Sequence, residues 1–282
     1  MTDDATSSGW FKDVDPDDLS GARDAIEYGT SESPADWPAR AVEAGFAVDE
    51  DDYYDKLHEA TTAAAREEVR ERERADDQQL KHSIRAMDDC ERTANELAER
   101  VAEWGGSRVG ESGGGVAFAR EIAEREPDSD LDEQLRALAE QVVDLDGRAT
   151  ELRASIERFT PEVAPNLSSM AGPVLAARLI TLSGGLKQLA RSTSGTVQVL
   201  GAEDALFAHL RGDAPSPKHG VIYTHEYVRG TALEHRGSAA RALAGKLTLA
   251  ARVDYYSGER RPELEAELDD RIATIRARGE NE

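Results

Sequence analysis

Two long runs of apolar residues, spaced alternately three and four positions apart, constrain this chain more than any other feature. The first run is Leu80, Ile84, Met87, Cys90, Ala94, Leu97, Val101 and Trp104. The second is Leu131, Leu135, Leu138, Val142, Leu145, Ala149, Leu152, Ile156 and Phe159. This spacing keeps a narrow apolar stripe on one side of a helix, which is the pattern of a coiled coil. At about 1.5 Å per residue, the second helix would be about 40 Å long.

A glycine-rich stretch, "GGSRVGESGGG" at 105–115, and a short amphipathic piece separate the two runs. The simplest arrangement is therefore a long antiparallel coiled-coil hairpin over 61–159 with a flexible tip. Its seam would close on itself or pair with a second copy. The residues predicted to serve dimerisation are Leu135, Leu138, Val142 and Leu145. Cys90 is the chain's single cysteine, which excludes an internal disulfide, and we expect it to be a small core residue of the seam.

The rest of the chain also predicts helices, so the fold class is mainly α. Residues 1–60 form a short acidic region in which Pro, Gly and Asp recur too often for a long helix. Its few large apolar residues would form a small lobe or short docking segments. The prolines of "TPEVAPN" at 160–166 predict the end of the second long helix. A compact all-helical domain over 160–261 and an acidic helix or tail over 262–282 would follow.

The chain is strongly acidic, with a net charge of -23 and only six Lys among its 34 basic residues. Acidic residues spread along most of the chain favour adaptation to high salt, as in halophilic archaea, over an acidic tail for basic partners. No segment approaches the about 18 apolar residues that cross a bilayer. The first residues lack the basic start and apolar run of a signal peptide. We therefore expect a cytoplasmic protein without membrane association.

Residues 161–261 depart from this acidity, because they hold eight acidic and twelve basic residues and four of the six histidines. Such a segment is either chance variation or a surface for a polyanion. In the long helix predicted within it, Arg241, Gly245, Thr248 and Arg252 fall on one side, opposite an apolar arc. Two guanidinium groups flanking small residues would admit a phosphate backbone; the alternative is two solvated arginines.

Several blocks of this segment carry a resemblance to a known family. They are "APNLSSMAGPVLAARLITLSGGLKQLARSTSGTVQVLGAEDALFAHLRG", "PKHGVIYTH" and "RGSAARALAGKLTLAARVDYYSGE". Together they resemble the Nop domain nearly continuously over about 160–261. This domain occurs in core scaffold proteins of box C/D small ribonucleoproteins and in a spliceosomal relative. The preceding hairpin, with "RVAEW", resembles the family's coiled-coil dimerisation module with a shortened tip. The first 60 residues resemble the family only faintly.

The resemblance implies a non-catalytic scaffold that guides 2′-O-methylation of RNA. In the family, the amino-terminal domain docks fibrillarin, the methyltransferase that uses S-adenosylmethionine, and the coiled coil joins two copies. The Nop domain binds box C/D guide RNA together with a kink-turn-binding ribosomal protein. We therefore expect these partners and no cofactor held by this chain itself.

The resemblance also implies site residues. The start of the "GAED" helix, where free backbone N–H groups favour phosphate, the Pro-bounded loop and the long helix would contact RNA. These residues are Gly201, Ala202, Glu203, Asp204, Lys218, His219, Arg236, Ser238, Arg241 and Arg252. A helix carrying Ala205, Leu206, Phe207 and His209 would meet the guide–substrate RNA.

Asp204, Ala208 and Ser238 depart from the family, which often has a basic residue at these positions. In molar salt the Debye length is about 3 Å, so long-range attraction to phosphate is nearly lost and short-range fit matters more. Either the lost charges matter little for this reason, or these three positions no longer contact RNA.

Other functional classes find less support in the sequence. "ESGGG" lacks the Lys and Ser/Thr of a phosphate-binding loop. The four histidines of the basic segment are separated by 10, 6 and 10 residues, which fits no standard metal-ligand pattern. A coiled-coil adaptor that binds only protein would explain 70–159 but not the basic segment. A spliceosomal-type Nop protein is an alternative within the family, against which the salt-adapted composition argues.

Overall fold

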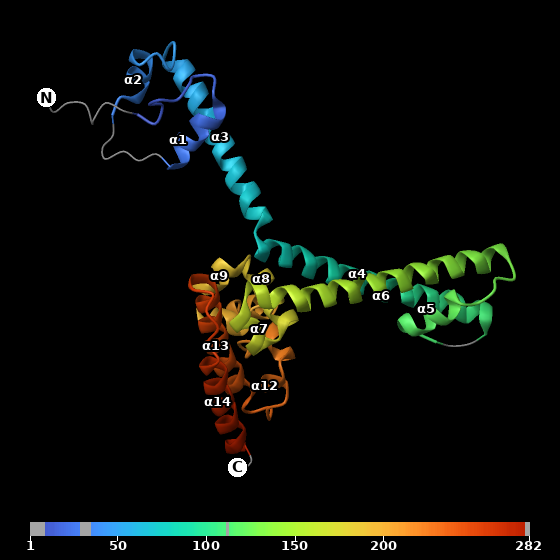
Figure 1. The fold of residues 1–282 in the computed structure, drawn as a ribbon. Helices are drawn as coiled ribbons and strands as arrows, with labels where there is room; N and C mark the ends of the chain where they lie inside the picture. Colours follow the sequence, from blue (N-terminus) through green and yellow to red (C-terminus); the bar gives the residue numbers. More distant parts are fainter. Residues whose placement is uncertain (1–8, 29–34, 111–112, 280–282) are drawn as a thin grey trace. The chain divides into compact units, whose positions relative to one another are not determined.

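The computed structural model of the chain describes residues 9–28, 35–110 and 113–279, and within these ranges it contains helices and no β-strand. This confirms the predicted mainly α class. The chain divides into two compact units, Met1–Ala75 and Asp76–Glu282 (Figure 1). The predicted boundary after residue 60 instead falls inside a continuous helix, Glu50–Arg74. The division lies at Ala75 because the backbone there leaves the helical conformation (φ -59°, ψ 142°).

The first unit is a small lobe built on aromatic side chains. It contains α1 (Leu19–Tyr28), α2 (Trp37–Glu43) and α3 (Glu50–Arg74). Asp49 caps α3 by accepting the N–H of Asp52 at 2.8 Å. Phe11, Phe46 and Tyr53 are buried together, and the rings of Phe11 and Phe46 stack at 5.5 Å. Of the two alternatives for this acidic region, the structure therefore has the folded lobe.

The second unit begins with the predicted helical hairpin. Its long arms are α4 (Asp76–Val109) and α6 (Asp130–Val163). The arms are antiparallel, since Glu91 pairs with Arg153 at 2.7 Å and Arg108 with Asp132 at 2.9 Å. The apolar seam thus closes within one chain.

A third helix, α5 (Gly115–Ala123), folds back onto the far part of the hairpin. Its Phe118, Ala119 and Ile122 are buried against both long arms. The expected flexible tip is shorter than predicted, because α4 continues through Gly105 to Val109. A Cβ at Gly105 would lie 3.1 Å from the Phe118 ring, so glycine there permits the close approach of α5. Residues 111–112 of the predicted tip lie outside the described residues.

The second arm also ends later than the sequence predicted. Pro161 lies inside α6, which ends at Val163 with Ala164 as its C-cap. Shorter helices then follow: α7 (Pro165–Ala171), α8 (Pro173–Ser183), α9 (Leu186–Arg191), α10 (Ser194–Val199), α11 (Glu203–Leu210), the 3₁₀ helix η1 (Val221–Thr224) and α12 (Glu226–Arg229). Two long helices complete the unit, α13 (Arg236–Tyr256) and α14 (Glu263–Gly279).

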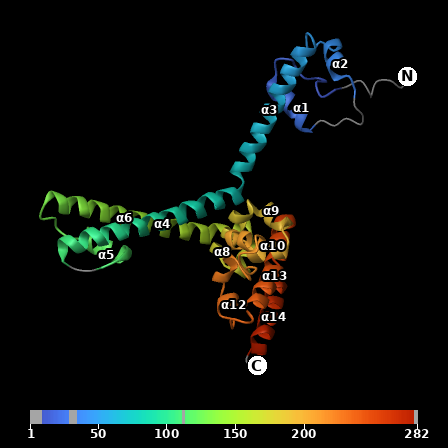
Figure 2. The same ribbon diagram turned by 180° about the vertical axis from the view of Figure 1, so that it is seen from behind.

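Helix α13 is the centre of the main core. Seven of its apolar residues are buried on one side, namely Ala239, Ala240, Leu243, Ala244, Leu247, Ala250 and Ala251. The many alanines let neighbouring helices approach closely, and Figure 2 shows α10 beside α13. Because α7, α9, α10, α12 and α14 all pack on α13, this one helix positions most of the surface described below.

The core extends beyond both predicted limits of the domain at 160–261. Leu80, Ile84, Met87 and Ile156 of the hairpin join it at one end. Leu268, Ile272 and Ile275 of α14 join it at the other. The acidic segment after 261 is therefore a packed helix of this domain and not a tail. None of the helices in the described residues is both long enough and apolar enough to cross a membrane.

Candidate RNA-binding surface

The loop that carries Lys218 and His219 is held against the end of α10 by two hydrogen bonds, one from the backbone of Gly220 and one from the side chain of Gln198. Gly220 N–H donates to the Gln198 carbonyl at 2.8 Å, and the Gln198 amide donates to the Lys218 carbonyl at 2.7 Å. A Cβ at Gly220 would lie 2.0 Å from the Leu200 carbonyl oxygen, so this position requires glycine. Both predicted site residues are therefore held at fixed positions on the second unit.

The same loop meets the start of α13. The side chain of Lys218 passes over Gly237, where an added Cβ would lie 3.7 Å from its Cδ. Arg236 donates from Nε to the Thr231 carbonyl at 3.0 Å, and its guanidinium lies 5.6 Å from the centroid of the Tyr223 ring. The structure thus brings Arg236 next to the loop of Lys218 and His219, although other helices separate them in the chain.

Tyr223 is a component of this site that the sequence reasoning did not name. Its ring stacks on His219 at 4.6 Å between centroids and 25° between planes. Burial lowers the pKa of His219, and the nearby charges of Arg236 and Lys218 lower it further. The imidazole is therefore neutral at pH 7. The sequence does place an aromatic residue, in "VIYT", four positions after His219, and this spacing could have indicated that Tyr223 belongs to the site.

Helix α11 starts at the predicted place, but its first turn is acidic. Its N-cap, Ala202, offers no side-chain cap, and the Glu203 carboxylate accepts the Gly201 N–H at 2.8 Å. With Asp204 beside Glu203, two negative charges occupy the helix start that was expected to favour phosphate. These charges oppose the helix dipole's attraction for an anion.

The rest of α11 is unusually exposed for an apolar helix. None of its residues is buried, and Phe207 and Leu210 are 59% and 71% exposed. The other expected members of this surface are Ala205, Leu206 and His209, and the last contacts the Ala214 carbonyl at 3.0 Å. Gly212 closes the helix with a positive φ of 84°. An exposed apolar helix is suited to contact with a flat apolar surface such as the end of a base stack.

The predicted stripe on α13 is only partly open. Ser238 and Arg241 are exposed, but Thr248 is 3% exposed and bonds to the Ala244 carbonyl, so its expected place on an exposed face is wrong. Neighbouring helices α9 and α10 pack on α13, which a plot of α13 alone does not reveal. Arg252 donates to the carbonyls of Ala190 at 3.0 Å and Ser192 at 3.3 Å, and so fastens the end of α9.

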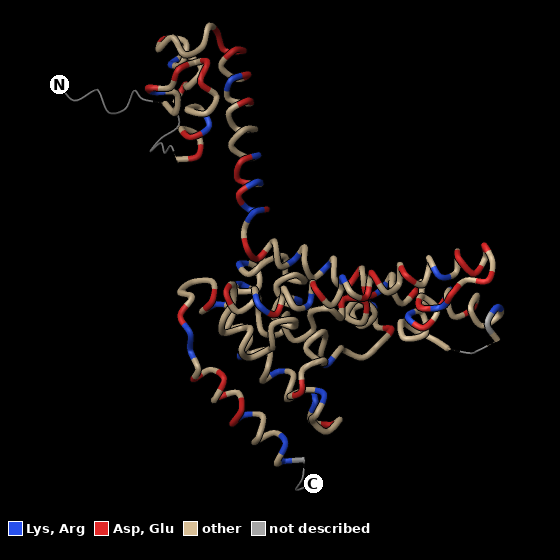
Figure 3. The backbone as a smooth tube through the Cα atoms, turned by 45° about the vertical axis from the view of Figure 1, so that its right-hand side comes forward, with Lys and Arg blue, Asp and Glu red and all other residues tan. Residues whose placement is uncertain are grey.

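Half of the basic residues in 161–261 pair with no carboxylate of the described residues. They are Lys187, Arg191, Lys218, Arg236, Arg241 and Arg252. By contrast, Arg178 pairs with Asp88 at 2.6 Å, and Lys246 pairs with Glu267. Figure 3 shows acidic and basic residues mixed along α3 and the hairpin. The uncompensated cations lie on α9, on α13 and, for Lys218, in the loop between α11 and η1, and we call this set the cationic face.

A cleft of about 740 Å³ lies elsewhere on the second unit, where the α7–α8 turn, α12 and α14 meet. His225 lines it and accepts the Tyr227 N–H at Nδ1, 3.1 Å away. Its Nε2 lies 3.0 Å from the Met170 carbonyl, to which it donates. Both ring nitrogens are thus used by the neutral imidazole, and burial lowers the pKa of His225.

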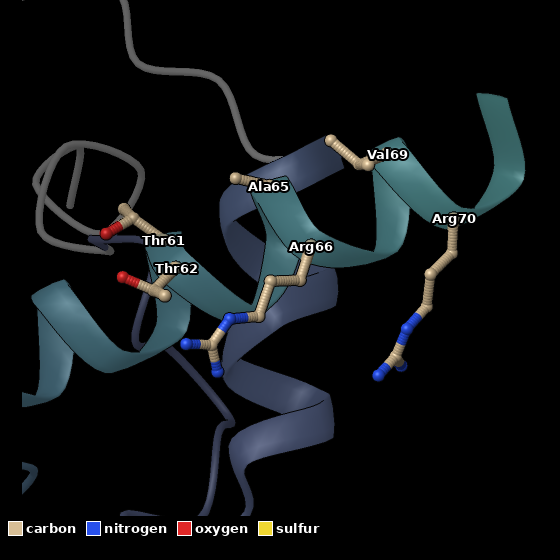
Figure 4. Close-up of a pocket in the computed structure, with 6 residues that line it drawn as sticks. All are labelled: Thr61, Thr62, Ala65, Arg66, Val69 and Arg70. Atoms are coloured by element: carbon tan, nitrogen blue, oxygen red, sulfur yellow. The ribbon is translucent and has the colours of Figure 1, made fainter. Parts of the chain in front are cut away.

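A shallower groove of about 560 Å³ runs along one face of α3 in the first unit. It is lined by Thr61, Thr62, Ala65, Arg66, Val69 and Arg70 (Figure 4). Figure 4 shows the guanidinium groups of Arg66 and Arg70 on the same side of the helix. Among the described residues, no three His, Cys, Asp or Glu side chains converge on a possible metal position in either unit.

Comparison with known proteins assigns the chain to a family. A family profile described as "Nop: snoRNA binding domain, fibrillarin" matches residues 117–275, which is over half of the chain. An uncharacterised NOP5 family protein of Methanocaldococcus jannaschii is 33% identical over 272 residues, covering 83% of this chain and 66% of that protein. Nucleolar protein 58 of Homo sapiens is 37% identical over 146 residues, covering 50% and 28%. The chain belongs to the Nop family, which confirms the resemblance.

The fold is shared with a chain in a crystal structure of a fibrillarin/Nop5p complex. The two chains align with a TM-score of 0.54 and 22% identity, over 90% of this chain and 92% of the other. The family match begins before α6 and continues into α14, in agreement with the shared core. This chain spans about two thirds of the archaeal relative and less than a third of the human one.

Proposed function

We propose that this chain is a non-catalytic, RNA-binding scaffold of a box C/D ribonucleoprotein that guides 2′-O-methylation. It would bridge guide RNA, a kink-turn-binding ribosomal protein and fibrillarin. The observation that carries the proposal is the cationic face, which remains uncompensated in a chain with a net charge of -23. Membership of a family described as snoRNA-binding supports the same conclusion.

Lys218 and Arg241 are the residues of the cationic face best suited to phosphate. Both are exposed, and no hydrogen bond or ion pair to another described residue occupies their charged groups. Ser238 is exposed one turn before Arg241, and its hydroxyl can donate to a phosphate oxygen without adding charge. Arg236 and Arg252 are held by backbone carbonyls, so they orient the surface as well as adding charge.

The exposed side of α11 would meet the guide–substrate RNA. Phe207 and Leu210, which are exposed, and Leu206, which is half-buried, offer apolar contact with the end of a base stack. Glu203 and Asp204 at the helix start keep phosphate away from it. This assigns α11 an apolar contact and leaves phosphate binding to the cationic face. This division is consistent with Asp204 and Ala208, which stand at positions where the family often has a basic residue.

The first unit would dock fibrillarin, and the methyl group would come from S-adenosylmethionine bound by that partner. The aromatic cluster of Phe11, Phe46 and Tyr53 makes the lobe rigid enough to present a fixed surface. The chain itself would hold no cofactor. We further propose that it works in the cytoplasm of a salt-adapted archaeon.

Self-association would use the outside of the hairpin. Leu135 and Val142 are buried between the hairpin's own helices, so they support dimerisation only by keeping the hairpin closed. Leu138 and Leu145 are half-buried, and Leu131 is 55% exposed. These three leucines are the seam residues that a second copy can reach.

Reconstitution tests the whole proposal. The purified chain is mixed with box C/D RNA, the kink-turn protein, fibrillarin and labelled S-adenosylmethionine, and methyl transfer to a complementary substrate RNA is measured. Methylation should require the chain, and the chain without fibrillarin should transfer nothing. Full methylation without the chain would remove the scaffold role. If the chain binds its protein partners but does not bind RNA, a coiled-coil adaptor is favoured.

A further inference from the structure

We propose that His219 and Tyr223 form a stacking platform for one unpaired base of the bound RNA. The proposal rests on the proposed RNA-binding function and adds a base contact to a surface otherwise described by charge. Single-stranded and bulged bases are commonly recognised by stacking on Tyr, His or Arg planes. The rings of His219 and Tyr223 already lie in such a stack, 4.6 Å apart and 25° from parallel.

The two rings are not part of a hydrophobic core. Tyr223 is 36% exposed, although its neighbour Ile222 is fully buried in the same short helix. Neither ring belongs to a buried cluster of the second unit. An aromatic pair kept at the surface loses the hydrophobic stabilisation that burial would give it, so a role in binding is the simpler explanation.

The platform is held rigidly before any ligand binds. Gly220 and Gln198 fix the backbone on the His219 side through the bonds at 2.8 and 2.7 Å. Arg236 fixes the other side, because its Nη1 lies 3.4 Å from the Tyr223 hydroxyl while its Nε is bonded to the Thr231 carbonyl. A preorganised surface loses little side-chain entropy on binding.

The surroundings suit a nucleotide in particular. Lys218 precedes His219 directly, and its charged group has no carboxylate partner among the described residues. A base on the ring pair would place its own phosphate within the field of Lys218 and Arg236. Stacking on a neutral ring is also insensitive to salt, unlike phosphate contact, so it suits a protein whose composition indicates high salt.

The test compares three proteins for affinity to one labelled box C/D guide RNA, in the presence of the kink-turn protein and at several salt concentrations. Tyr223→Leu should weaken binding about 5- to 100-fold at every salt concentration. The slope of affinity against salt should stay unchanged, because a stacked ring releases no counterion. Tyr223→Phe keeps the ring and loses only the 3.4 Å contact of its hydroxyl with Arg236, so it should lose much less affinity than Tyr223→Leu. Circular dichroism confirms that each variant is folded, and His219→Ala provides a second disruption should Tyr223→Leu unfold.

A second measurement locates the base. A set of guide RNAs, each with one unpaired nucleotide made abasic, is titrated with wild type and Tyr223→Leu. At the nucleotide whose base stacks on the platform, the losses of binding free energy from the abasic change and from Tyr223→Leu should be non-additive, because both changes remove the same contact. Additive losses at every position, or equal affinity of Tyr223→Leu and wild type, would overturn the platform while leaving RNA binding intact. A wild type that binds no RNA would overturn the proposed function and the platform together.

Discussion

The carboxylate of Asp254, near the end of α13, accepts the backbone N–H of Asn166 at 3.0 Å, although the two residues are 88 positions apart. The same carboxylate accepts the Leu167 N–H at 2.8 Å. Ala164, the N-cap of α7, has no side chain that could satisfy these groups. Asp254 therefore caps α7 from another helix, and it joins the end of the hairpin to the end of α13.

We expect Asp254→Ala to destabilise the second unit by about 2–4 kcal/mol, because it removes the acceptor of three N–H groups: the two backbone groups and the side-chain amide of Asn166. Asp254→Asn keeps one acceptor oxygen and should cost less. Asp270→Ala removes the same charge from an exposed position of α14 and serves as the control. Thermal unfolding followed by circular dichroism measures all three, and equal midpoints for Asp254→Ala and Asp270→Ala would show that the cap contributes nothing.

His225 should make the stability of the second unit depend on pH. Burial lowers its pKa in the folded chain, with the charge of Arg276 acting in the same direction and Glu226 in the opposite one. Between the folded pKa and the unfolded value of about 6.5, the unfolded state binds more protons. The stabilisation that neutral His225 gives to the folded unit is therefore complete above about pH 6.5, and it is lost as the pH falls below that value.

The variant His225→Asn isolates this effect. Asparagine can still accept the Tyr227 N–H at the start of α12, but it binds no proton in this range. Its unfolding midpoint should fall less than that of the wild type between pH 7.5 and pH 5.5. His58→Asn, in the first unit, should leave the wild-type pH dependence in place. The idea fails if His225→Asn and the wild type lose stability in parallel.

The hairpin seam gives a matched pair of substitutions. Val142 is fully buried between α4, α5 and α6, so Val142→Asp places an unpaired charge in an apolar core at a cost of several kcal/mol. Leu131 belongs to the same heptad series but is 55% exposed, so Leu131→Asp should leave the helix content unchanged. Circular dichroism reports helix content, and light scattering reports the mass of any dimer. Equal helix content for both variants would contradict the buried seam.

The hairpin could be predicted because its signal is local. A spacing of three and four residues places Leu135 and Val142 on one stripe whatever surrounds the helix. The aromatic lobe was open to two interpretations, since the pairing of Phe11 with Tyr53 depends on a chain reversal that no local pattern encodes. The contribution of α14 was missed, although Leu268, Ile272 and Ile275 have helical spacing, because the surrounding acidic composition suggested a solvated segment.

The site was predicted by composition and resemblance more than by geometry. The helical plot of α13 placed Arg241 correctly on an exposed side but failed at Thr248, because other helices cover that position. It also left unseen that Arg252 binds carbonyls of α9. Tyr223 escaped notice because its importance comes from its contact with His219, which depends on how the loop closes.

These differences separate the roles of the arginines in a final prediction. Arg241 is exposed and makes no polar contact with other described residues, whereas Arg252 fastens the end of α9 through two carbonyls. Arg241→Ala should therefore weaken binding of labelled box C/D RNA by about 1–3 kcal/mol and flatten its salt dependence, with no change in thermal unfolding. Arg252→Ala should lower the unfolding midpoint as well as the affinity.

The neutral control is Arg271→Ala, which changes an exposed residue of α14. Arg276 is unsuitable for that purpose, because it donates to the Glu226 carbonyl at 2.9 Å and helps hold α12. If Arg241→Ala and Arg271→Ala bind RNA equally, Arg241 is a solvated side chain and the phosphate contact lies elsewhere on the cationic face.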